Sequence, residues 1–154
     1  MKETDASPAA PVPGAASGFG TDAVPGTVLP ELAVETSRSR IIAAALATRD
    51  YARVHHDPSV ARDGGVPDVF VNILSTNAYV GRFVQEWAGP GAEIKNIAIR
   101  LGIPNHAGDT LTLSGQVAAV EGSTVTVEVA GRNARGVHVS GRVDVDLKET
   151  ADVR

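Results

Sequence analysis

The sequence of 154 residues contains no cysteine, and that absence excludes several kinds of chemistry. Disulfide bonds, metal sites built from thiolates and cysteine nucleophiles are all ruled out. Without thiols or disulfides, the sequence also carries no redox evidence for the compartment in which the protein works.

The sequence also lacks an excess of positive charge and any long apolar run. Its net charge of -4 and isoelectric point near 5.5 argue against nucleic acid as the main partner, because no basic surplus exists to neutralise phosphates. This balance does not exclude a local basic patch for a small phosphorylated ligand. No run approaches the ~18 apolar residues of a membrane span, and the N-terminal residues lack the apolar core of a signal peptide. We therefore expect a cytoplasmic protein that has neither nucleic acid nor a membrane as a partner.

The length and composition fit one globular domain. Hydrophobic residues make up 43% of the sequence and charged residues 21%, which is close to the average for soluble proteins. Prolines and glycines are scattered among alanines and serines through residues 1–28, a composition typical of a disordered tail. We expect the folded domain over residues 29–148 and a short C-terminal tail over residues 149–154.

The C-terminal third alternates apolar and polar residues, as half-buried strands do. In one run, Val125, Val127 and Val129 share a face, while Thr124 and Thr126 share the other. Turn signals separate the runs, which predicts consecutive strands in an antiparallel meander. The four runs span residues 93–102, 109–120, 124–133 and 138–147.

Residues 69–88 have the period of one long amphipathic helix, which the Gly-Pro-Gly at residues 89–91 ends. Its predicted core stripe contains Ile73, Val80, Val84 and Trp87 with Phe83 beside it, and its predicted polar face contains Ser75, Arg82 and Glu86.

Residues 37–47 fit either a strand or a helix. We favour a strand, followed by a short helix that Thr48 caps at its N-terminus. The predicted class is α+β, with about five antiparallel strands curled around one long central helix.

The segment "RDYARVHHDP" at residues 49–58 holds two of the four histidines. Asp50 and His55 are five residues apart, and a carboxylate and an imidazole that meet at one water make a general acid–base pair. The spacing fits equally a surface or capping carboxylate and an unrelated loop histidine. The residues alone leave both interpretations open.

The order of this segment, an apolar helix and antiparallel strands resembles the MaoC-like hydratases of the hotdog superfamily. Their usual motif is Asp-x-Asn-Pro-x-His, and Asp50 and His55 occupy its two ends. The resemblance covers roughly residues 30–148 and includes the strand, proline, Gly-Asp, strand pattern at residues 99–117. Two departures stand out: Ala52-Arg53 replaces the motif's Asn-Pro, and Val71-Asn72 replaces a His-Gly pair.

Four segments narrow the resemblance: "LATRDYARVHHD", "DVFVNIL", "WAGP" and "GRNARGVHV". Together they resemble the small subunit of the heteromeric enoyl-CoA hydratase of actinobacterial steroid side-chain degradation. The resemblance implies that water adds across the α,β double bond of a steroid enoyl-CoA substrate. No separate cofactor is implied, because coenzyme A is part of the substrate. In this chemistry Asp50 and His55 would activate the water and supply the proton to the α-carbon.

The resemblance also suggests supporting groups around the pair. The backbone N–H at about Asn72, where the long helix starts, would stabilise charge on the thioester oxygen. His56 has no counterpart in the motif, and we interpret it mainly as a loop residue, with support of the water as the alternative. Asp57 is expected to stabilise the turn before Pro58. We expect no metal site.

Other polar residues are assigned plainer roles. His106 and His138 are expected to be turn and strand residues, and Trp87 and Phe83 to pack in the core. The phosphates of coenzyme A need cationic contacts, for which the candidates are Arg100, Arg132, Arg135 and Arg142.

The resemblance implies a partner, since hotdog domains pair through their sheets. That partner would be a larger MaoC-like subunit with an additional zinc-ribbon/OB-type domain, and two of each would form a heterotetramer. Two alternatives stay open. One is a hotdog acyl-CoA thioesterase, although the helix offers only Glu86, near its C-terminal end. The other is a non-catalytic scaffold subunit that completes a partner's active site, although a scaffold would not need both Asp50 and His55.

Overall fold

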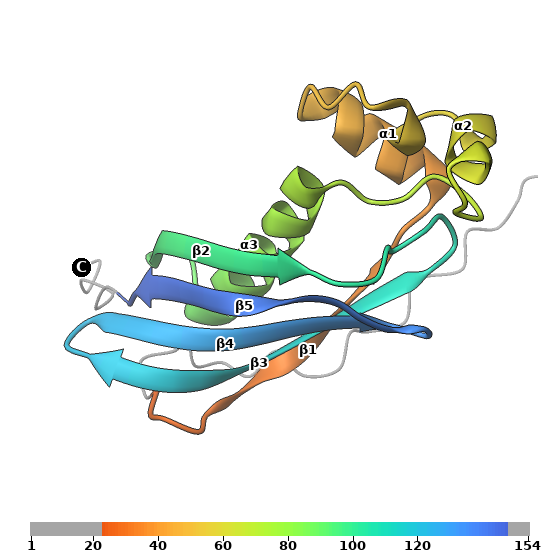
Figure 1. Ribbon diagram of the computed structural model, residues 1–154. Coiled ribbons are helices and arrows are strands. Elements are labelled where there is room, and N and C mark those ends of the chain that lie inside the picture. The colour runs from red at the N-terminus through yellow and green to blue at the C-terminus, as the bar shows by residue number, and fades with distance from the viewer. Residues whose placement is uncertain (1–22, 148–154) are drawn as a thin grey trace, which may run out of the picture.

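The structure is a computed structural model, and it describes residues 23–147. Figure 1 shows a curled sheet with the helix α3 along one face and the helices α1 and α2 beyond its end. In chain order the elements are β1 (Val28–Glu35), α1 (Arg38–Ala47), the 3-10 helix η1 (Arg53–His55), α2 (Pro58–Asp63), α3 (Ile73–Ala88), β2 (Glu93–Leu101), β3 (Thr110–Glu121), β4 (Thr124–Asn133) and β5 (Gly136–Asp146).

Most of the expected N-terminal tail and all of the expected C-terminal tail lie outside the described residues. Within the described part, β1 already begins at Val28, the last residue of the expected N-terminal tail, and two residues before it contact the sheet. The Gly26 N–H donates to the Val117 carbonyl at 2.8 Å, and the Val117 N–H donates to the Thr27 carbonyl at 2.8 Å. Contacts with β3 therefore begin before residue 29.

The five strands form one sheet in the order β1-β3-β4-β5-β2, and every pair is antiparallel. The predicted α+β class with a sheet around one long helix is confirmed. The predicted four-strand meander is right for β3, β4 and β5 but wrong for β2, which pairs with β5, as in Ile97 opposite Val143. Alternating residues show that a strand exists but not which strand it pairs with. The eight-residue connection from 102 to 109 lets β3 lie apart from β2, whereas a two-residue turn holds β3 and β4 together.

The helix α3 buries one face against the sheet. Val80, Phe83 and Val84 are buried there together with valines of β4 and β5, as the predicted stripe required. The prediction is wrong for Ile73, which is 50% exposed, and for Ser75, which is buried. Both lie in the first turn of α3, and this turn faces the residues that follow α1 rather than the sheet core. Trp87 is partly buried against the core.

Residues 38–47 form the helix α1, so the predicted strand is wrong. Ser37 caps its N-terminus by accepting a hydrogen bond from the Arg40 N–H, and the following alanine-rich run favours a helix. Thr48 lies at the C-terminus of α1, where its hydroxyl donates to the Ala44 carbonyl at 2.8 Å, and it is not an N-cap. Among residues 23–147, no helix is long and apolar enough to cross a membrane.

Candidate active site

A tight turn after α1 brings Asp50 out of the helix. The Asp50 N–H still donates to the Ala45 carbonyl at 2.9 Å, while Arg49 has a φ of 56°, a left-handed conformation that side chains other than glycine rarely adopt. η1 and α2 follow at once, and Asp57 caps α2 by accepting from the Ser59 N–H at 2.9 Å. Hydrogen bonds from the Ser59 hydroxyl and Arg53 hold the pKa of Asp57 well below its usual range. Asp57 therefore stabilises this turn, as expected.

The structure brings Asp50 and His55 together. Asp50 Oδ2 lies 3.5 Å from His55 Nε2, and the His55 side chain is 10% exposed against 26% for Asp50. The other ring nitrogen, His55 Nδ1, donates to the Phe70 carbonyl at 2.8 Å. A carbonyl oxygen only accepts, so Nδ1 carries a proton, and in the neutral form of the ring the lone pair of Nε2 faces Asp50. The Phe70 ring also meets the His55 ring edge-on, with centroids 4.8 Å apart.

Asp50 is held as a carboxylate by donors on both oxygens. Asn72 Nδ2 donates to Oδ2 at 3.0 Å, and the Ala52 N–H donates to Oδ1 at 3.2 Å. The Asn72 hydrogen bond is the main cause that lowers the pKa of Asp50, partial burial opposes it, and His55 and His56 add to the lowering. Asp50 is therefore ionised at neutral pH and can accept a proton or orient a water.

Asn72 is the N-cap of α3, and its side chain does more than the sequence predicted. Its Oδ1 accepts from the Ser75 N–H at 2.9 Å, while its Nδ2 reaches Asp50. Within the described residues, the backbone N–H groups of Asn72, Ile73 and Leu74 have no hydrogen-bond partner. An asparagine directly before an apolar helical run is a typical N-cap signal, and it could have identified the cap but not the contact with Asp50.

His56 does not reach the Asp50 carboxylate. Its Nε2 donates to the backbone carbonyl of Asp50 at 2.7 Å, and its side chain is partly buried. The ring therefore braces the turn that carries Asp50. A role for His56 in supporting the water stays a prediction.

The other two histidines, His106 and His138, are buried. His138 is on β5, with Nδ1 donating to the Ile103 carbonyl at 2.8 Å and Nε2 3.0 Å from the Thr76 hydroxyl. His106 lies in the connection between β2 and β3, with Nδ1 accepting from Arg135 at 2.7 Å. Burial is the main cause that lowers the pKa of each ring. Their predicted places in a turn and a strand are confirmed, and neither contacts Asp50 or His55 in the described structure.

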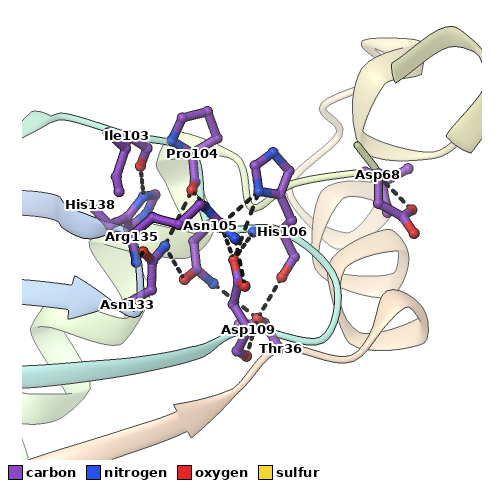
Figure 2. Close-up of polar contacts among 11 residues, drawn as sticks. Thr36, Asp68, Ile103, Pro104, Asn105, His106, Asp109, Asn133, Arg135 and His138 are labelled. Carbon is purple, nitrogen blue, oxygen red and sulfur yellow. Dashed lines mark hydrogen bonds and ion pairs between the residues drawn. The ribbon is translucent and has the colours of Figure 1, made fainter. Parts of the chain in front are cut away.

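A polar cluster around His106 fixes the segment that orients His55. Figure 2 shows Arg135 and Asp109 beside the His106 ring, with dashed lines joining them to their neighbours. The cluster anchors His106, and backbone hydrogen bonds join residues 105–107 to residues 69–71, since the Val71 N–H donates to the Asn105 carbonyl at 2.9 Å. Phe70 lies in that segment, and its carbonyl sets the tautomer of His55. Sequence reasoning missed Phe70, since a backbone carbonyl leaves no signal in residue type.

The remaining candidates lie apart from the pair. Glu86 is in the last turn of α3, at the end opposite to Asn72, and forms an exposed ion pair with Arg82 at 2.7 Å.

The four arginines proposed for coenzyme A differ in their contacts. Arg135 pairs with Asp109 and Arg142 pairs with Glu128. Arg100 and Arg132 are exposed and form no ion pair with the described residues. Residues 23–147 contain no group of three or more histidine or acidic side chains that could hold a metal ion.

Comparisons with known proteins extend these observations. No family model matches the sequence. The 3-oxo-4,17-pregnadiene-20-carboxyl-CoA hydratase beta subunit of Mycobacterium tuberculosis is 47% identical over 127 residues, which are 82% of this chain and 98% of that protein. A chain of the crystal structure of the ChsH1-ChsH2 complex from Mycobacterium tuberculosis matches with a TM-score of 0.79 and 48% identity, over 81% of this chain and 98% of that chain.

A more distant structure has the same fold. The (R)-hydratase from A. caviae involved in PHA biosynthesis matches with a TM-score of 0.74 over 83% of this chain and 99% of that chain, at 20% identity. At this identity the likeness concerns the hotdog fold alone. The family is shown by the mycobacterial subunit, because nearly half of the aligned residues are identical along almost its whole length. The chain therefore belongs to the MaoC-like hydratase family of the hotdog fold, the family of that hydratase beta subunit.

Proposed function

We propose that this chain is the catalytic small subunit of a heteromeric enoyl-CoA hydratase. Its substrate would be a steroid side chain with an α,β double bond, bound as a coenzyme A thioester, and no further cofactor is required. The named relative, a hydratase beta subunit that acts on a pregnadiene carboxyl-CoA, supports the substrate class. The observation that best supports a hydration reaction is the contact between Asp50 Oδ2 and His55 Nε2 at 3.5 Å.

A water molecule can use both groups at once. In the neutral form of His55, Nε2 and the ionised Asp50 present two acceptors to each other, and two lone pairs at this distance repel unless a proton lies between them. A water that donates one proton to each group relieves this repulsion. Its oxygen lone pairs then point away from the pair, which is the orientation that a nucleophile needs.

The addition balances without a net change in the pair. The water oxygen bonds to the β-carbon while one of its protons passes to His55 Nε2. The electron pair of the double bond moves toward the thioester carbonyl and gives an enolate, and Asp50 stabilises the imidazolium. The imidazolium then gives its Nε2 proton to the α-carbon, which restores the neutral ring and completes the hydrated product.

The enolate oxygen needs hydrogen-bond donors, and the start of α3 offers them. The backbone N–H of Asn72, together with those of Ile73 and Leu74, is not bonded to the described residues. These groups lie at the positive end of a 16-residue helix, which favours a nearby negative charge. We assign the stabilisation of the thioester oxygen to this helix start.

Apolar side chains next to the pair suit an apolar acyl group or a partner surface. Tyr51 follows Asp50 directly and is 69% exposed, and Leu74, two residues after Asn72, is 48% exposed. Exposed large apolar side chains on a soluble domain often mark a binding surface. Burying them against a steroid or a second subunit would stabilise the bound state.

We also propose that the chain works with a larger MaoC-like subunit that carries a zinc-ribbon/OB-type domain, two of each forming a heterotetramer. The related crystal structure, which is of a ChsH1-ChsH2 complex, supports a partner in the family. Within residues 23–147 the sheet ends in two edge strands, β1 and β2, and an unpaired edge can add a strand from another chain. A cytoplasmic location remains our prediction for this assembly.

Two other functions are less well supported. A thioesterase would need a carboxylate near the thioester carbon, but Glu86 is ~20 Å along α3 from the helix start and is already paired with Arg82. A scaffold subunit would have no use for a histidine tautomer fixed by Phe70 and a carboxylate fixed by Asn72.

The product of the reaction distinguishes these functions. The chain, co-expressed and purified with its larger subunit, is incubated with a steroid enoyl-CoA, and the products are identified by mass spectrometry. We expect the substrate to gain the mass of one water with the thioester intact. Release of free coenzyme A would identify a thioesterase. Hydration that is unchanged when His55→Ala replaces the wild-type chain in the complex would leave only the scaffold function.

A further inference from the structure

We propose that the Asn72 side chain is a positioning residue that holds the Asp50 carboxylate in its reactive orientation. This inference rests on the proposed function and concerns the amide of Asn72, not the backbone N–H assigned above to the thioester oxygen. The Asn72 side chain would join the start of the central helix α3 to the catalytic pair.

Three hydrogen bonds of the Asn72 side-chain amide fix its orientation. The two Nδ2 protons go to Thr48 Oγ1 at 2.9 Å and to Asp50 Oδ2 at 3.0 Å, and Oδ1 accepts from the Ser75 N–H at 2.9 Å. A flipped amide would turn Nδ2 against the Ser75 N–H and Oδ1 against a carboxylate. The residue is 3% exposed, so water does not compete for these groups.

Thr48 helps to fix the same amide. Its hydroxyl proton donates to the Ala44 carbonyl at 2.8 Å, which leaves the Oγ1 lone pair to accept from Asn72. Thr48 lies at the C-terminus of α1, two residues before Asp50. The amide therefore spans from the end of α1 to the start of α3 and closes the turn that carries Asp50.

The backbone of Asn72 is anchored to the sheet. Its carbonyl accepts from the Thr76 N–H at 3.1 Å, and the Thr76 hydroxyl lies 3.0 Å from His138 Nε2. His138 Nδ1 in turn donates to the Ile103 carbonyl. Because His138 and Thr76 are both buried, this chain of contacts gives Asn72 a rigid support on β5.

The contact selects the oxygen that takes part in the reaction. Oδ2 of Asp50 is both the oxygen bonded to Asn72 and the oxygen that lies 3.5 Å from His55 Nε2. With Ala52 N–H on Oδ1, the carboxylate cannot rotate without losing two hydrogen bonds. Its plane is thereby set for a water that bridges Oδ2 and Nε2. Without Asn72, the carboxylate could rotate away from His55.

The capping role and the positioning role can be separated by the choice of variant. Serine is as good an N-cap as asparagine, so Asn72→Ser keeps a cap for the Ser75 N–H. Its short hydroxyl side chain lacks the amide Nδ2 that donates to Asp50. Asn77→Ser is the matched control, since it makes the same change about one turn later in α3, where Asn77 Nδ2 donates to the Ile73 carbonyl at 3.1 Å.

The test measures steroid enoyl-CoA hydration by the assembled complex as a function of pH, together with thermal unfolding. For Asn72→Ser we expect kcat to fall roughly 10- to 100-fold, with KM nearly unchanged and unfolding close to that of Asn77→Ser. The acid limb of the pH profile should move to higher pH, because loss of a donor to the charged form raises the pKa of Asp50. Two titratable groups, His55 and His56, face Asp50, and both are unchanged in the two variants.

The outcomes distinguish this inference from the proposed function. A kcat within about twofold of wild type and an unmoved acid limb overturn the positioning role. If Asn72→Ser does not assemble, Asn72→Asp decides, since aspartate keeps the cap but replaces the donor by a second carboxylate, and full activity of that variant would equally overturn it. Asp50→Asn is measured in parallel. If Asp50→Asn is fully active, the proposed function fails. If Asp50→Asn is inactive and Asn72→Ser has normal activity, only the role of Asn72 fails.

Discussion

The protonation states of the candidate site are set by a few backbone and amide groups. The Phe70 carbonyl places the proton of His55 on Nδ1, and the Asn72 amide keeps Asp50 ionised. Neither group would take part in the reaction itself. A change that moved the Phe70 segment would therefore alter the orientation of His55 without replacing that residue.

The sequence could predict which residues form the pair but not how they meet. Asp50 and His55 are separated by four residues, and the 3.5 Å contact depends on the left-handed conformation of Arg49 and on the short helix η1. An arginine at a positive φ has no sequence signal, because glycine or asparagine normally marks such a position. The contact from Asn72 is equally invisible, since it joins residues 22 apart in the sequence.

His138 gives a testable pH dependence of stability. Its burial lowers its pKa below the ordinary value of a histidine. Between the folded and the unfolded pKa values, the unfolded chain binds a proton that the folded chain does not bind, so the free energy of unfolding decreases as the pH falls below about 6.5. One such proton costs at most about 1.4 kcal/mol per pH unit.

We expect His138→Gln to be less stable than wild type at pH 7.5 and to lose less stability on acidification. Urea unfolding at pH 7.5 and at pH 5.5 measures both quantities. The variant keeps His106, whose pKa is lowered in the same direction, so some loss should remain. An equal loss in wild type and variant would show that His138 does not contribute to the pH dependence.

The secondary-structure elements were predictable to different degrees. The period of α3 and the alternation of β3, β4 and β5 gave the correct structure because each element packs one face on a common core. The region at residues 37–47 was wrongly predicted because the adjacent isoleucines 41 and 42 suit a strand, while the Ser37 cap and the alanines suit a helix. Packing decided in favour of the helix, which buries Ile41 and Ala45 on one side.

The pairing of β2 with β5 depends on a close approach at Gly141. A Cβ atom at this position would overlap the carbonyl oxygen of Ala98 and lie 2.8 Å from the Cα of Ile99. Both atoms belong to the backbone of β2 and cannot move aside as a flexible side chain would. The glycine therefore permits the edge strand to lie against the sheet.

We expect Gly141→Ala to lower the free energy of unfolding by about 2–3 kcal/mol or more, because the two strands would be pushed apart. Gly91→Ala is the matched control: no atom lies within 4 Å of a Cβ built there, and we expect a change of less than about 0.5 kcal/mol. Denaturant unfolding of the two variants measures the difference. Equal stability would contradict the close packing of β5 on β2.

At the scale of the whole molecule, the site lies at one end of the sheet, where α1, η1 and the start of α3 meet. Figure 1 shows this helical region beyond the end of the strands, and the Asp50–Asn72 contact holds it to the central helix. The Arg135–Asp109 ion pair fixes the connection between β2 and β3, which contacts the segment at residues 69–71. Two sets of contacts in the fold thus support the segments that carry Asp50 and His55.

The sequence predicted the class and the family of the whole molecule because many residues contribute to both. The alternating strands, the long helix and the motif ends at Asp50 and His55 each agree with the same fold. The order of the strands depends on the path of one connection, residues 102–109, and a single sequence does not determine such a path. The partner and the substrate class rest on the similarity to the mycobacterial hydratase subunit.

The central claim is that Asp50 and His55 act as one unit on a single water. The most direct test is a double-mutant cycle in the assembled complex, which measures kcat for steroid enoyl-CoA hydration with Asp50→Asn, His55→Ala and both together. Each single change should lower kcat by roughly 10²- to 10⁴-fold, and the double variant should be no slower than the slower single variant, because the second change removes nothing further. Losses that multiply in the double variant, or near wild-type turnover in either single variant, would contradict the account.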